Sequence, residues 1–430
     1  MDSDDAAGKT VNLTRRSALA GASAGGALLL SSAAGAQRSA ALVRAYAAPR
    51  QLKNVDHAIV YRRDNQFCGW PHTRGFWNMG NGELLQNFDC VPTNYASPDA
   101  INHNNMIDKV NTLGNDVTKM LTVRSKDYGR TWDGAHATVN MYEKIARGTQ
   151  NAKALADLGP IDYSDPNVLL ANVGPDFGTP KARTLVRVSR DRGHSWSPGF
   201  PVQLDGLHSL SSINSVLVRP DGTVMIWLFE VGAEGFDRHP LIYALPPGGT
   251  DFRFMSFITP KQDPYGAADG DYSGTLRFGG HRWFYPRGHL LPSGRMLCVL
   301  RCQRDPRGVM WTEIFASDDG GDTWNFLSRV NDFGAPGSLV QLSDGRLVMV
   351  YGYRLMPSGI RAKVSEDEGK TWGPELIVRD DGGSWDLGYP NAWVTDDGKV
   401  GVIYYFNSKD DPVKVNGGVR HIVRTIFSVD

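Results

Sequence analysis

The stretch SDDGGDTW (residues 317–324) fits the pattern S-x-D-x-G-x-(S/T)-W, and the recurrence of this pattern decides the fold. Its Ser and Asp side chains can accept backbone N–H groups, its Gly can adopt a positive φ, and its Trp can tuck under a sheet. Each copy therefore predicts a turn between two strands. One Asp-x-Gly turn would be weak evidence, whereas four full copies indicate a repeated structural unit. The other copies are SKDYGRTW (125–132), SRDRGHSW (189–196) and SEDEGKTW (365–372).

A second repeat interleaves with the first and completes the unit. Short polar segments separate pairs of apolar runs, which is the usual signal for a tight hairpin. The resulting order is strand A, tight turn, strand B, loop, strand C, octapeptide and strand D. We therefore predict an all-β, six-bladed β-propeller with four strands per blade, and a seven-bladed ring is the alternative. The hairpin sites are 81–82, 221–222, 293–294, 344–345 and 397–398, with 165–167 as the sixth.

Two predicted blades lack the octapeptide. In the third blade, PPGGT (residues 246–250) looks like a degenerate version, and the last blade ends one strand short within residues 421–429. The apolar segment VDHAIVY (residues 55–61) can donate the missing strand. We expect this N-terminal strand to close the ring and to remove the open sheet edges.

Residues 1–50 have the composition of an export leader and linker, and residues 51–430 form the predicted propeller domain. Arg15 and Arg16 precede an Ala/Gly/Leu-rich run that reaches a small-x-small cleavage site, AGA, at residues 34–36. This pattern is typical of a twin-arginine signal, so we expect the export machinery as a partner and a periplasmic or secreted location. The run is short and weakly apolar for a membrane span, so we expect no stable membrane anchor.

The four cysteines fit a protein that folds before export, in a reducing compartment. Cys298 and Cys302 are four residues apart on a predicted strand, which separates them by roughly 13 Å and prevents bridging. Cys68 and Cys90 flank one predicted hairpin. They can pair or remain isolated buried thiols, and the sequence leaves both alternatives open.

Net charge excludes one broad class of partner. The 46 basic residues balance the 46 acidic ones, so no global field gathers nucleic acid, and we expect no nucleic-acid partner. The sequence contains no CxxC pair or HxxxH cluster that suggests zinc. We expect neither a metal nor a cofactor.

Polar and aromatic residues mark one end of the blades. If the tight turns and octapeptides share one face, the opposite face carries the starts of strand A and the ends of strand B, which surround the central pocket. Arginines gathered beside carboxylates need compensating partners, so we interpret this set as an anion-binding sugar pocket. The alternative is that these residues form salt bridges with one another. The set comprises Trp70, Arg74, Asp89, His208, Glu230, Arg301, Arg354, Tyr389 and Tyr405.

The octapeptide resembles the Asp box of the sialidase and BNR-repeat families, and the resemblance covers residues 55–430. It implies a retaining exo-glycosidase that hydrolyses an acidic terminal sugar from a glycan. Family members use a Tyr nucleophile assisted by a Glu, an Asp acid and three arginines that hold the substrate carboxylate. The resemblance implies Tyr389 or Tyr405 as the nucleophile, assisted by Glu230, and Asp89 as the acid. It implies that the substrate carboxylate is held by Arg74, Arg301 and Arg354. Trp70 and His208 are further substrate-binding candidates.

One segment departs from the family pattern. Sialidases begin their first blade with an Arg-Ile-Pro type segment, whereas this chain has CGWPHTR (residues 68–74), which displaces Arg74 relative to its Pro. Related propellers include polysaccharide lyases, and fold alone does not choose among chemistries. A uronate lyase with a Tyr or His base and a non-catalytic glycan-binding propeller therefore remain alternatives.

The leader generates a direct prediction. Replacing both Arg15 and Arg16 by Lys should strand the precursor in the cytoplasm, because the paired guanidinium groups are the export signal. Fractionation of cells that express the double variant measures this. Normal export of the double variant would contradict the assignment of a twin-arginine leader.

Overall fold

The structure is a computed structural model that describes residues 47–97, 119–140, 155–233, 238–260, 282–303 and 309–430. Arg15, Arg16 and most of the predicted leader lie outside the described residues. From Ala48 onward the chain forms one compact unit. Nearly all of its regular structure is β, and helices are short turns such as α2 (Pro71–Arg74). In the described part of the chain, no helix is long and apolar enough to cross a membrane.

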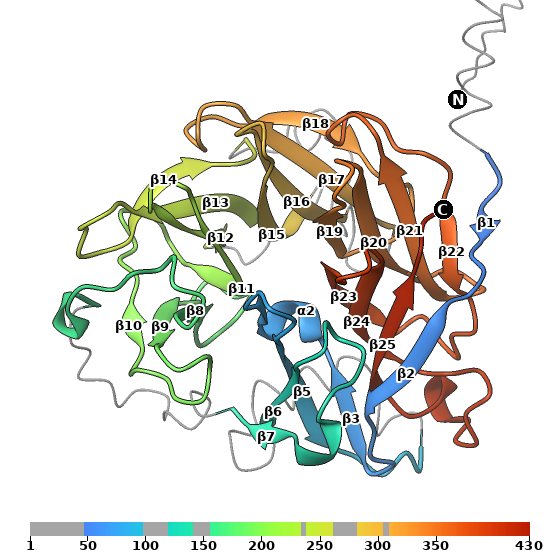
Figure 1. The fold of residues 1–430 in the computed structure, drawn as a ribbon. Coiled ribbons are helices and arrows are strands. Elements are labelled where there is room, and N and C mark those ends of the chain that lie inside the picture. Colours follow the sequence, from blue (N-terminus) through green and yellow to red (C-terminus); the bar gives the residue numbers. More distant parts are fainter. Residues whose placement is uncertain (1–46, 98–118, 141–154, 234–237, 261–281, 304–308) are drawn as a thin grey trace, which may run out of the picture. The chain divides into compact units, whose positions relative to one another are not determined.

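Six separate sheets follow one another around a centre, which confirms the predicted six-bladed propeller (Figure 1). Blade 1 contains β3 (Gln66–Gly69), β4 (Phe76–Asn78), β5 (Leu84–Pro92), β6 (Lys119–Ser125) and β7 (Thr138–Val139). Blade 2 contains β8 (Leu169–Val173), β9 (Leu185–Ser189) and β10 (Phe200–Pro201). Blade 3 contains β11 (Ser211–Val218), β12 (Val224–Val231), β13 (Arg238–Leu245) and β14 (Arg253–Phe257).

The remaining blades have four antiparallel strands each, and the N-terminal segment adds a fifth to blade 5. Blade 4 contains β15 (Arg282–Leu290), β16 (Met296–Gln303), β17 (Met310–Ser317) and β18 (Asn325–Arg329). Blade 5 contains β19 (Gly337–Gln341), β20 (Leu347–Tyr353), β21 (Gly359–Ser365) and β22 (Leu376–Arg379). Blade 6 contains β23 (Gly388–Val394), β24 (Val400–Phe406) and β25 (His421–Phe427).

The N-terminal segment closes the ring as predicted. Strand β2 (Asp56–Tyr61) pairs antiparallel with β25 and supplies the outermost strand of blade 6. The preceding β1 (Arg50–Gln51) pairs parallel with β22 of blade 5, which was not predicted. One continuous segment therefore joins the outer edges of two neighbouring blades (Figure 1).

Blade 2 departs from the predicted four strands. Within the described residues it has three, because the segment before residues 165–167 forms a short helix, η4 (Leu155–Leu158), and turns. The prediction that residues 165–167 form a sixth A–B hairpin was therefore wrong. The local sequence correctly signals a turn, in which the Asp165 side chain accepts the Asn167 N–H at 2.8 Å. A turn signal alone does not require a strand on both sides.

The octapeptides adopt one hydrogen-bond pattern in all four copies. In blade 4, the Gly321 N–H donates to Ser317 Oγ at 2.8 Å, and the Thr323 N–H donates to Asp319 Oδ1 at 2.9 Å. Hydrogen bonds from Thr323 lower the pKa of Asp319, so its carboxylate stays charged and accepting. The equivalent Gly-to-Ser bonds start from Gly129, Gly193 and Gly369.

The octapeptide tryptophans are half-buried, whereas a residue that anchors a turn to the core is expected to be fully buried. Trp324 packs at the edge of the core cluster that contains Trp227 and Trp283, and its Nε1 donates to the Gly321 carbonyl at 3.1 Å. The indole thus links the turn to the space between blades 3 and 4.

Trp324→Ala should lower the free energy of unfolding by about 2 kcal/mol, below the roughly 3–5 kcal/mol typical of a fully buried aromatic, because part of the ring is already exposed. Denaturant unfolding measures the change. Asp322→Ala is the matched control, since Asp322 is an exposed variable position of the same turn and should shift stability by less than about 0.5 kcal/mol. A Trp324→Ala protein as stable as the wild type would contradict the anchoring role.

Candidate functional site

Strand register places the predicted site residues at the blade ends opposite the Asp boxes. In blade 4, Ser317 of the box pairs with Met296, whereas Arg301 pairs with Phe284 and Thr312 at the other end of the same strands. Tyr405 likewise pairs with Gly388, beside Tyr389, at the start of β23. The Asp-box turns and the candidate functional residues therefore lie at opposite ends of the blades.

Three aromatic residues at this end share a strained backbone. Trp70, Tyr285 and Tyr389 have φ of 55°, 58° and 53°, and each precedes a proline. Left-handed backbone is unfavourable for bulky residues, and a following Pro normally pushes a residue toward extended geometry. At Tyr285 and Tyr389 the ladder register also shifts, which indicates a β-bulge. Such strain is typical of sites where a side chain must be re-aimed for function.

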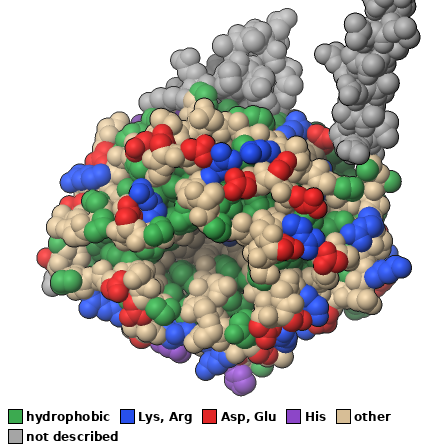
Figure 2. Space-filling view, turned by 45° about the horizontal axis from the view of Figure 1, so that its top comes forward, with side chains coloured by type: hydrophobic (Ala, Val, Ile, Leu, Met, Phe, Trp, Pro, Cys, Tyr) green, Lys and Arg blue, Asp and Glu red, His purple; other side chains and the backbone are tan. Residues whose placement is uncertain are grey.

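All three rings line one cavity of about 210 Å³. This size suits a compact group such as one sugar ring, since pockets for drug-sized ligands usually span ~300–1,000 Å³. In the space-filling view the molecule is hollowed near its middle, and mainly apolar and uncharged side chains lie inside the hollow (Figure 2). The other lining residues are Thr73, Arg74, Phe177, Gly178, Phe229, Arg238 and Phe284.

The Tyr389 hydroxyl lies among cationic and hydroxyl groups. Arg301 Nη1 donates to Tyr389 Oη at 2.9 Å, and the Tyr285 hydroxyl lies 3.3 Å from the same oxygen. The Arg354 guanidinium stacks 5.3 Å from the Tyr389 ring centroid, and the ring of Trp385 lies 5.5 Å from the same guanidinium. Blades 4, 5 and 6 thus converge on one phenol.

The environment drives the two tyrosine pKa values apart. Burial alone would raise the pKa of Tyr389, but the charges of Arg301 and Arg354, with the Tyr285 hydrogen bond, outweigh burial and lower it. Burial and the charge of a Tyr389 phenolate raise the pKa of Tyr285. A hydroxyl pair with opposed shifts can divide acid and base roles, with Tyr389 as the base or nucleophile and Tyr285 as the neutral donor.

Neither Arg301 nor Arg354 has a carboxylate partner among the described residues. Arg301 Nη2 donates to Gln303 Oε1 at 2.6 Å, and Arg354 Nη2 donates to the Leu387 carbonyl at 3.2 Å. The Nε atoms of both arginines are buried without a hydrogen-bond partner in the described structure. The hydrogen-bond partners of these two partly buried cations are thus neutral within the described structure, although the charge of Asp386 also acts on Arg354. An anionic ligand would therefore be stabilised beside them.

Arg74 differs from these two arginines. Its Nε donates to Asp89 Oδ2 at 2.6 Å, so a carboxylate already balances part of its charge although it lines the cavity. Burial raises the pKa of Asp89, and the charge and hydrogen bond of Arg74 oppose that shift. Arg74 and Asp89 therefore form a salt bridge with each other, which was the alternative to an anion-binding role in the sequence analysis.

The structure does not bring Glu230 or His208 to the tyrosine pair. Glu230 follows Phe229 on β12, and since alternate residues point to opposite sheet faces, only Phe229 faces the cavity. The Glu230 carboxylate instead accepts the backbone N–H of His208 at 2.8 Å. His208 itself is exposed and does not line the cavity.

Tyr405, the second candidate nucleophile, is poorly placed for that role. Its hydroxyl donates to Asp386 Oδ1, and both residues are buried. Burial and the Asp386 charge raise the pKa of Tyr405 well above its ordinary range. Its ring lies 5.8 Å from that of Tyr389, so Tyr405 packs against Tyr389.

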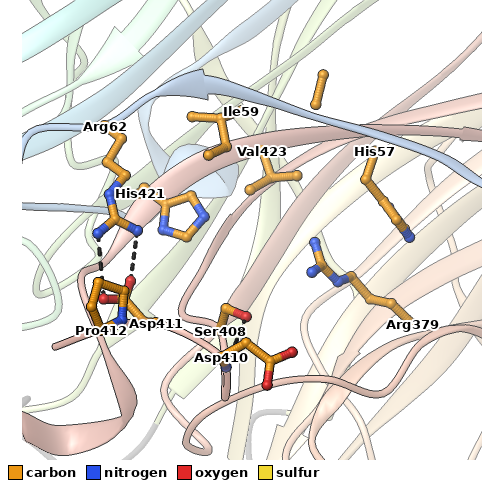
Figure 3. Close-up of a pocket in the computed structure, with 11 residues that line it drawn as sticks. His57, Ile59, Arg62, Arg379, Ser408, Asp410, Asp411, Pro412, His421 and Val423 are labelled. Atoms are coloured by element: carbon orange, nitrogen blue, oxygen red, sulfur yellow. Dashed lines mark hydrogen bonds and ion pairs between the residues drawn. The ribbon is translucent and has the colours of Figure 1, made fainter. Parts of the chain in front are cut away.

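A second cavity, of about 310 Å³, lies in blade 6 beside β2 and has no comparable features. Arg62 forms a two-pronged ion pair with Asp411, at 2.6 and 3.3 Å (Figure 3). Arg379 points into this cavity but is bound by Asp381 at 2.6 Å. Burial and the charge of Arg379 lower the pKa of His57 to about 4, so this histidine adds no cation. Both arginines here already have carboxylate partners, so this cavity offers no free charge to an anion.

Three residues at or beside the first cavity, here called the mouth, were not among the site residues predicted from the sequence. Tyr285 could have been found, because its Tyr-Pro dipeptide repeats that of Tyr389. Arg238 lines the cavity and stacks 5.0 Å from the ring of Phe284, but no repeat marks it. Trp385 is 46 % exposed beside Arg354 and offers a flat apolar face at the rim, which only its spatial position reveals.

The fold and repeats define a class: a six-bladed Asp-box β-propeller with the fold of sialidases. Residues 285–402 match the family described as the BNR repeat-like domain. No curated protein matches the sequence. Solved structures that resemble this chain share its fold.

Three solved structures illustrate the likeness. A Dyadobacter fermentans protein of unknown function is 21% identical, with a TM-score of 0.64 over 88% of this chain and 100% of that one. The Trypanosoma rangeli sialidase is 14% identical, with a TM-score of 0.51 over 87% and 59% of the two chains. An endosialidase of phage phi92 is 9% identical, with a TM-score of 0.53 over 88% and 69%.

Absorbance titration should detect the opposed pKa shifts. The titration of the wild type should contain an ionisation step of one tyrosine below the ordinary pKa of about 10, here called the low step. Tyr389→Phe should remove the low step, because the cations beside Tyr389 favour its phenolate. Arg301→Gln should move the step to higher pH. Tyr405→Phe is the control and should leave the low step in place. Survival of the low step in Tyr389→Phe would show that another residue produces it.

Proposed function

We propose that this protein is an exported, glycan-active enzyme that hydrolyses an acidic terminal sugar from a glycan with retention of configuration. The observation that carries the proposal is the pair Arg301 and Arg354, which flank Tyr389 without a carboxylate partner among the described residues. A substrate carboxylate would supply the missing anion. Arginine suits this task because its planar fork can donate two parallel hydrogen bonds to a carboxylate.

Tyr389 is the proposed nucleophile. Its phenolate would attack the anomeric carbon and form a covalent glycosyl-enzyme while the glycosidic oxygen leaves with a proton, and water would then release the sugar. Because Glu230 faces His208, activation of Tyr389 rests on Arg301, Arg354 and the Tyr285 hydrogen bond. Asp89 remains the candidate acid, since burial raises the pKa of its carboxyl.

The walls of the mouth suit a sugar. Trp70 lines the cavity, where an aromatic ring can pack against the apolar face of a pyranose. Arg74 adds a polar group to the same wall while Asp89 holds it. Trp385 at the rim offers a further ring to the part of the glycan outside the cavity.

Uronate elimination is a second candidate, and the Tyr285–Tyr389 pair favours it. A lyase removes the proton next to the carboxylate and expels the glycosidic oxygen, so it needs a base, an acid and neutralisation of the carboxylate. The lowered pKa of Tyr389 and the raised pKa of Tyr285 provide base and acid 3.3 Å apart. Arg301 and Arg354 would neutralise the carboxylate.

One assay separates the candidates. A panel of sialylated and uronate-containing oligosaccharides is incubated with the protein, and products are measured by mass and ultraviolet absorbance. Hydrolysis adds the elements of water, whereas elimination adds none and creates an absorbing double bond. Sugar binding without any product would instead favour a non-catalytic glycan-binding propeller.

Arg354→Lys tests the carboxylate site most directly. The variant keeps the charge but loses the planar fork, so kcat/KM on an acidic substrate should fall by a factor on the order of 100, or about 2.7 kcal/mol of transition-state binding. A neutral analogue should be a poor substrate for both proteins and lose little further.

Arg379→Lys is the matched control. Arg379 also stacks on an aromatic ring, that of Phe406, and pairs with a carboxylate, but it lies in the second cavity. The Arg379→Lys variant should therefore have the kcat/KM of the wild type. Equal losses on acidic and neutral substrates for Arg354→Lys would contradict the carboxylate-binding role, and an equal loss for Arg379→Lys would indicate a general structural effect.

A further inference from the structure

Two thiols face each other across the first blade. Cys68 on β3 and Cys90 on β5 are direct cross-strand partners, and their Sγ atoms lie 3.5 Å apart. Both side chains are buried, at 0% and 4% exposure. The sequence alone left two alternatives open, a disulfide and two isolated thiols. The strand register brings the two cysteines close enough for a disulfide.

The type of cross-strand pair also suits a covalent link. The Cys68 N–H donates to the Arg420 carbonyl at 3.2 Å, so it points away from β5. Cys68 and Cys90 therefore form a non-hydrogen-bonded pair, in which Cα atoms of antiparallel strands approach to about 4.5 Å. This distance falls within the roughly 4.4–6.8 Å that a disulfide spans.

The other two cysteines provide an internal contrast. Cys298 and Cys302 are also buried, but they lie four residues apart on one strand, β16. Their separation along the strand is roughly 13 Å, which no disulfide can bridge. Of these two pairs, only Cys68 and Cys90 lie close enough to be linked in the folded chain.

We propose that Cys68 and Cys90 are a modification site, and that they form a disulfide when the folded protein meets a disulfide oxidant. One cysteine thiolate attacks the oxidant disulfide, forms a mixed disulfide and displaces one thiolate. The second cysteine thiolate then attacks the mixed disulfide and displaces the other. The two cysteine sulfurs lose two electrons and two protons, and the oxidant becomes two thiols.

The reduced pair is compatible with folding, which fits a chain that folds before the link forms. Both thiols belong to the core cluster that contains Trp70, Tyr389 and Tyr405. Burial and the contact with Cys90 raise the pKa of the Cys68 thiol, so exchange in the folded state is slow and needs local opening of the β3 edge.

The link would stabilise one wall of the candidate site. Gly69 and Asp89 form the next cross-strand pair, and Trp70 follows immediately on the chain. A bond between Cys68 and Cys90 would join the segment that carries Trp70 to the segment that carries Asp89. The inference does not depend on the proposed reaction, because it rests on the strand register and on the distance between the two sulfur atoms.

The test uses the purified full-length protein, incubated with oxidised glutathione just below its unfolding temperature. The sample is then unfolded, alkylated and analysed by intact mass and peptide mapping, beside a fully reduced sample. The reduced protein should show four alkylated cysteines. The oxidised protein should show alkylation at Cys298 and Cys302 only, a peptide linked through Cys68 and Cys90, and the loss of two hydrogen atoms.

Thermal unfolding supplies the second readout. The oxidised wild type should unfold a few degrees higher than the reduced wild type, because the link restricts the unfolded chain. Cys68→Ser should lose both the linked peptide and the shift, whereas Cys302→Ser should retain both. Four free thiols after oxidation, glutathione retained on Cys68 or Cys90, or a lower unfolding temperature on oxidation would each overturn the proposal.

Discussion

Closure of the ring by β2 is the constraint on which the remaining structure depends. Blade 6 obtains three strands from the C-terminal end of the chain, and its outermost strand comes from Asp56–Tyr61. Without this strand, β25 would present an open edge and blade 6 would be incomplete. That blade carries Tyr389 on β23 and Tyr405 on β24, so the pairing of the two chain ends is a condition for the candidate site as well as for the fold.

The closed ring also explains how strained residues can persist at the centre. A left-handed bulky residue before proline costs on the order of 1–3 kcal/mol and survives only when its surroundings determine it. At Tyr389 those surroundings include Arg301 from blade 4, Arg354 from blade 5 and the buried His72 of α2, whose Nδ1 lies 2.7 Å from the Pro390 carbonyl. Residues from two neighbouring blades and α2 therefore hold one phenol in place.

The sequence predicts those parts of the structure that depend on local chemistry. Each octapeptide contains its own donors and acceptors within eight residues, so SDDGGDTW predicts its turn wherever it lies. Ring closure also follows from counting strands and locating an unpaired apolar run at 55–61. The three strands that the described residues form in blade 2 were not predictable in this way, because a turn at 165–167 is compatible with a strand or a helix before it.

The site was predicted in part, and its errors have a common physical origin. Register counting predicted Arg301, Arg354 and Tyr389 at the same end of their blades, because strand ends recur at fixed distances from the hairpins. In the structure both arginines contact Tyr389. It failed for Glu230, because one residue of offset turns a strand side chain to the other face of the sheet. It also missed Tyr285, whose bulged backbone re-aims the ring at Tyr389.

Charge compensation finally separates two groups of arginines in the described part of the chain. Arg62, Arg74 and Arg379 each bind a carboxylate of the chain, at Asp411, Asp89 and Asp381. Such pairs are complete without a ligand, and their arginines position loops and strands. Among the described residues, Arg301 and Arg354 instead donate hydrogen bonds to phenol, amide and carbonyl groups, and neither forms an ion pair with a carboxylate. Because a partly buried cation without an ion-pair partner is unfavourable, binding of an anion would be stabilising beside Arg301 and Arg354. The arginines of the second cavity, Arg62 and Arg379, already have such partners.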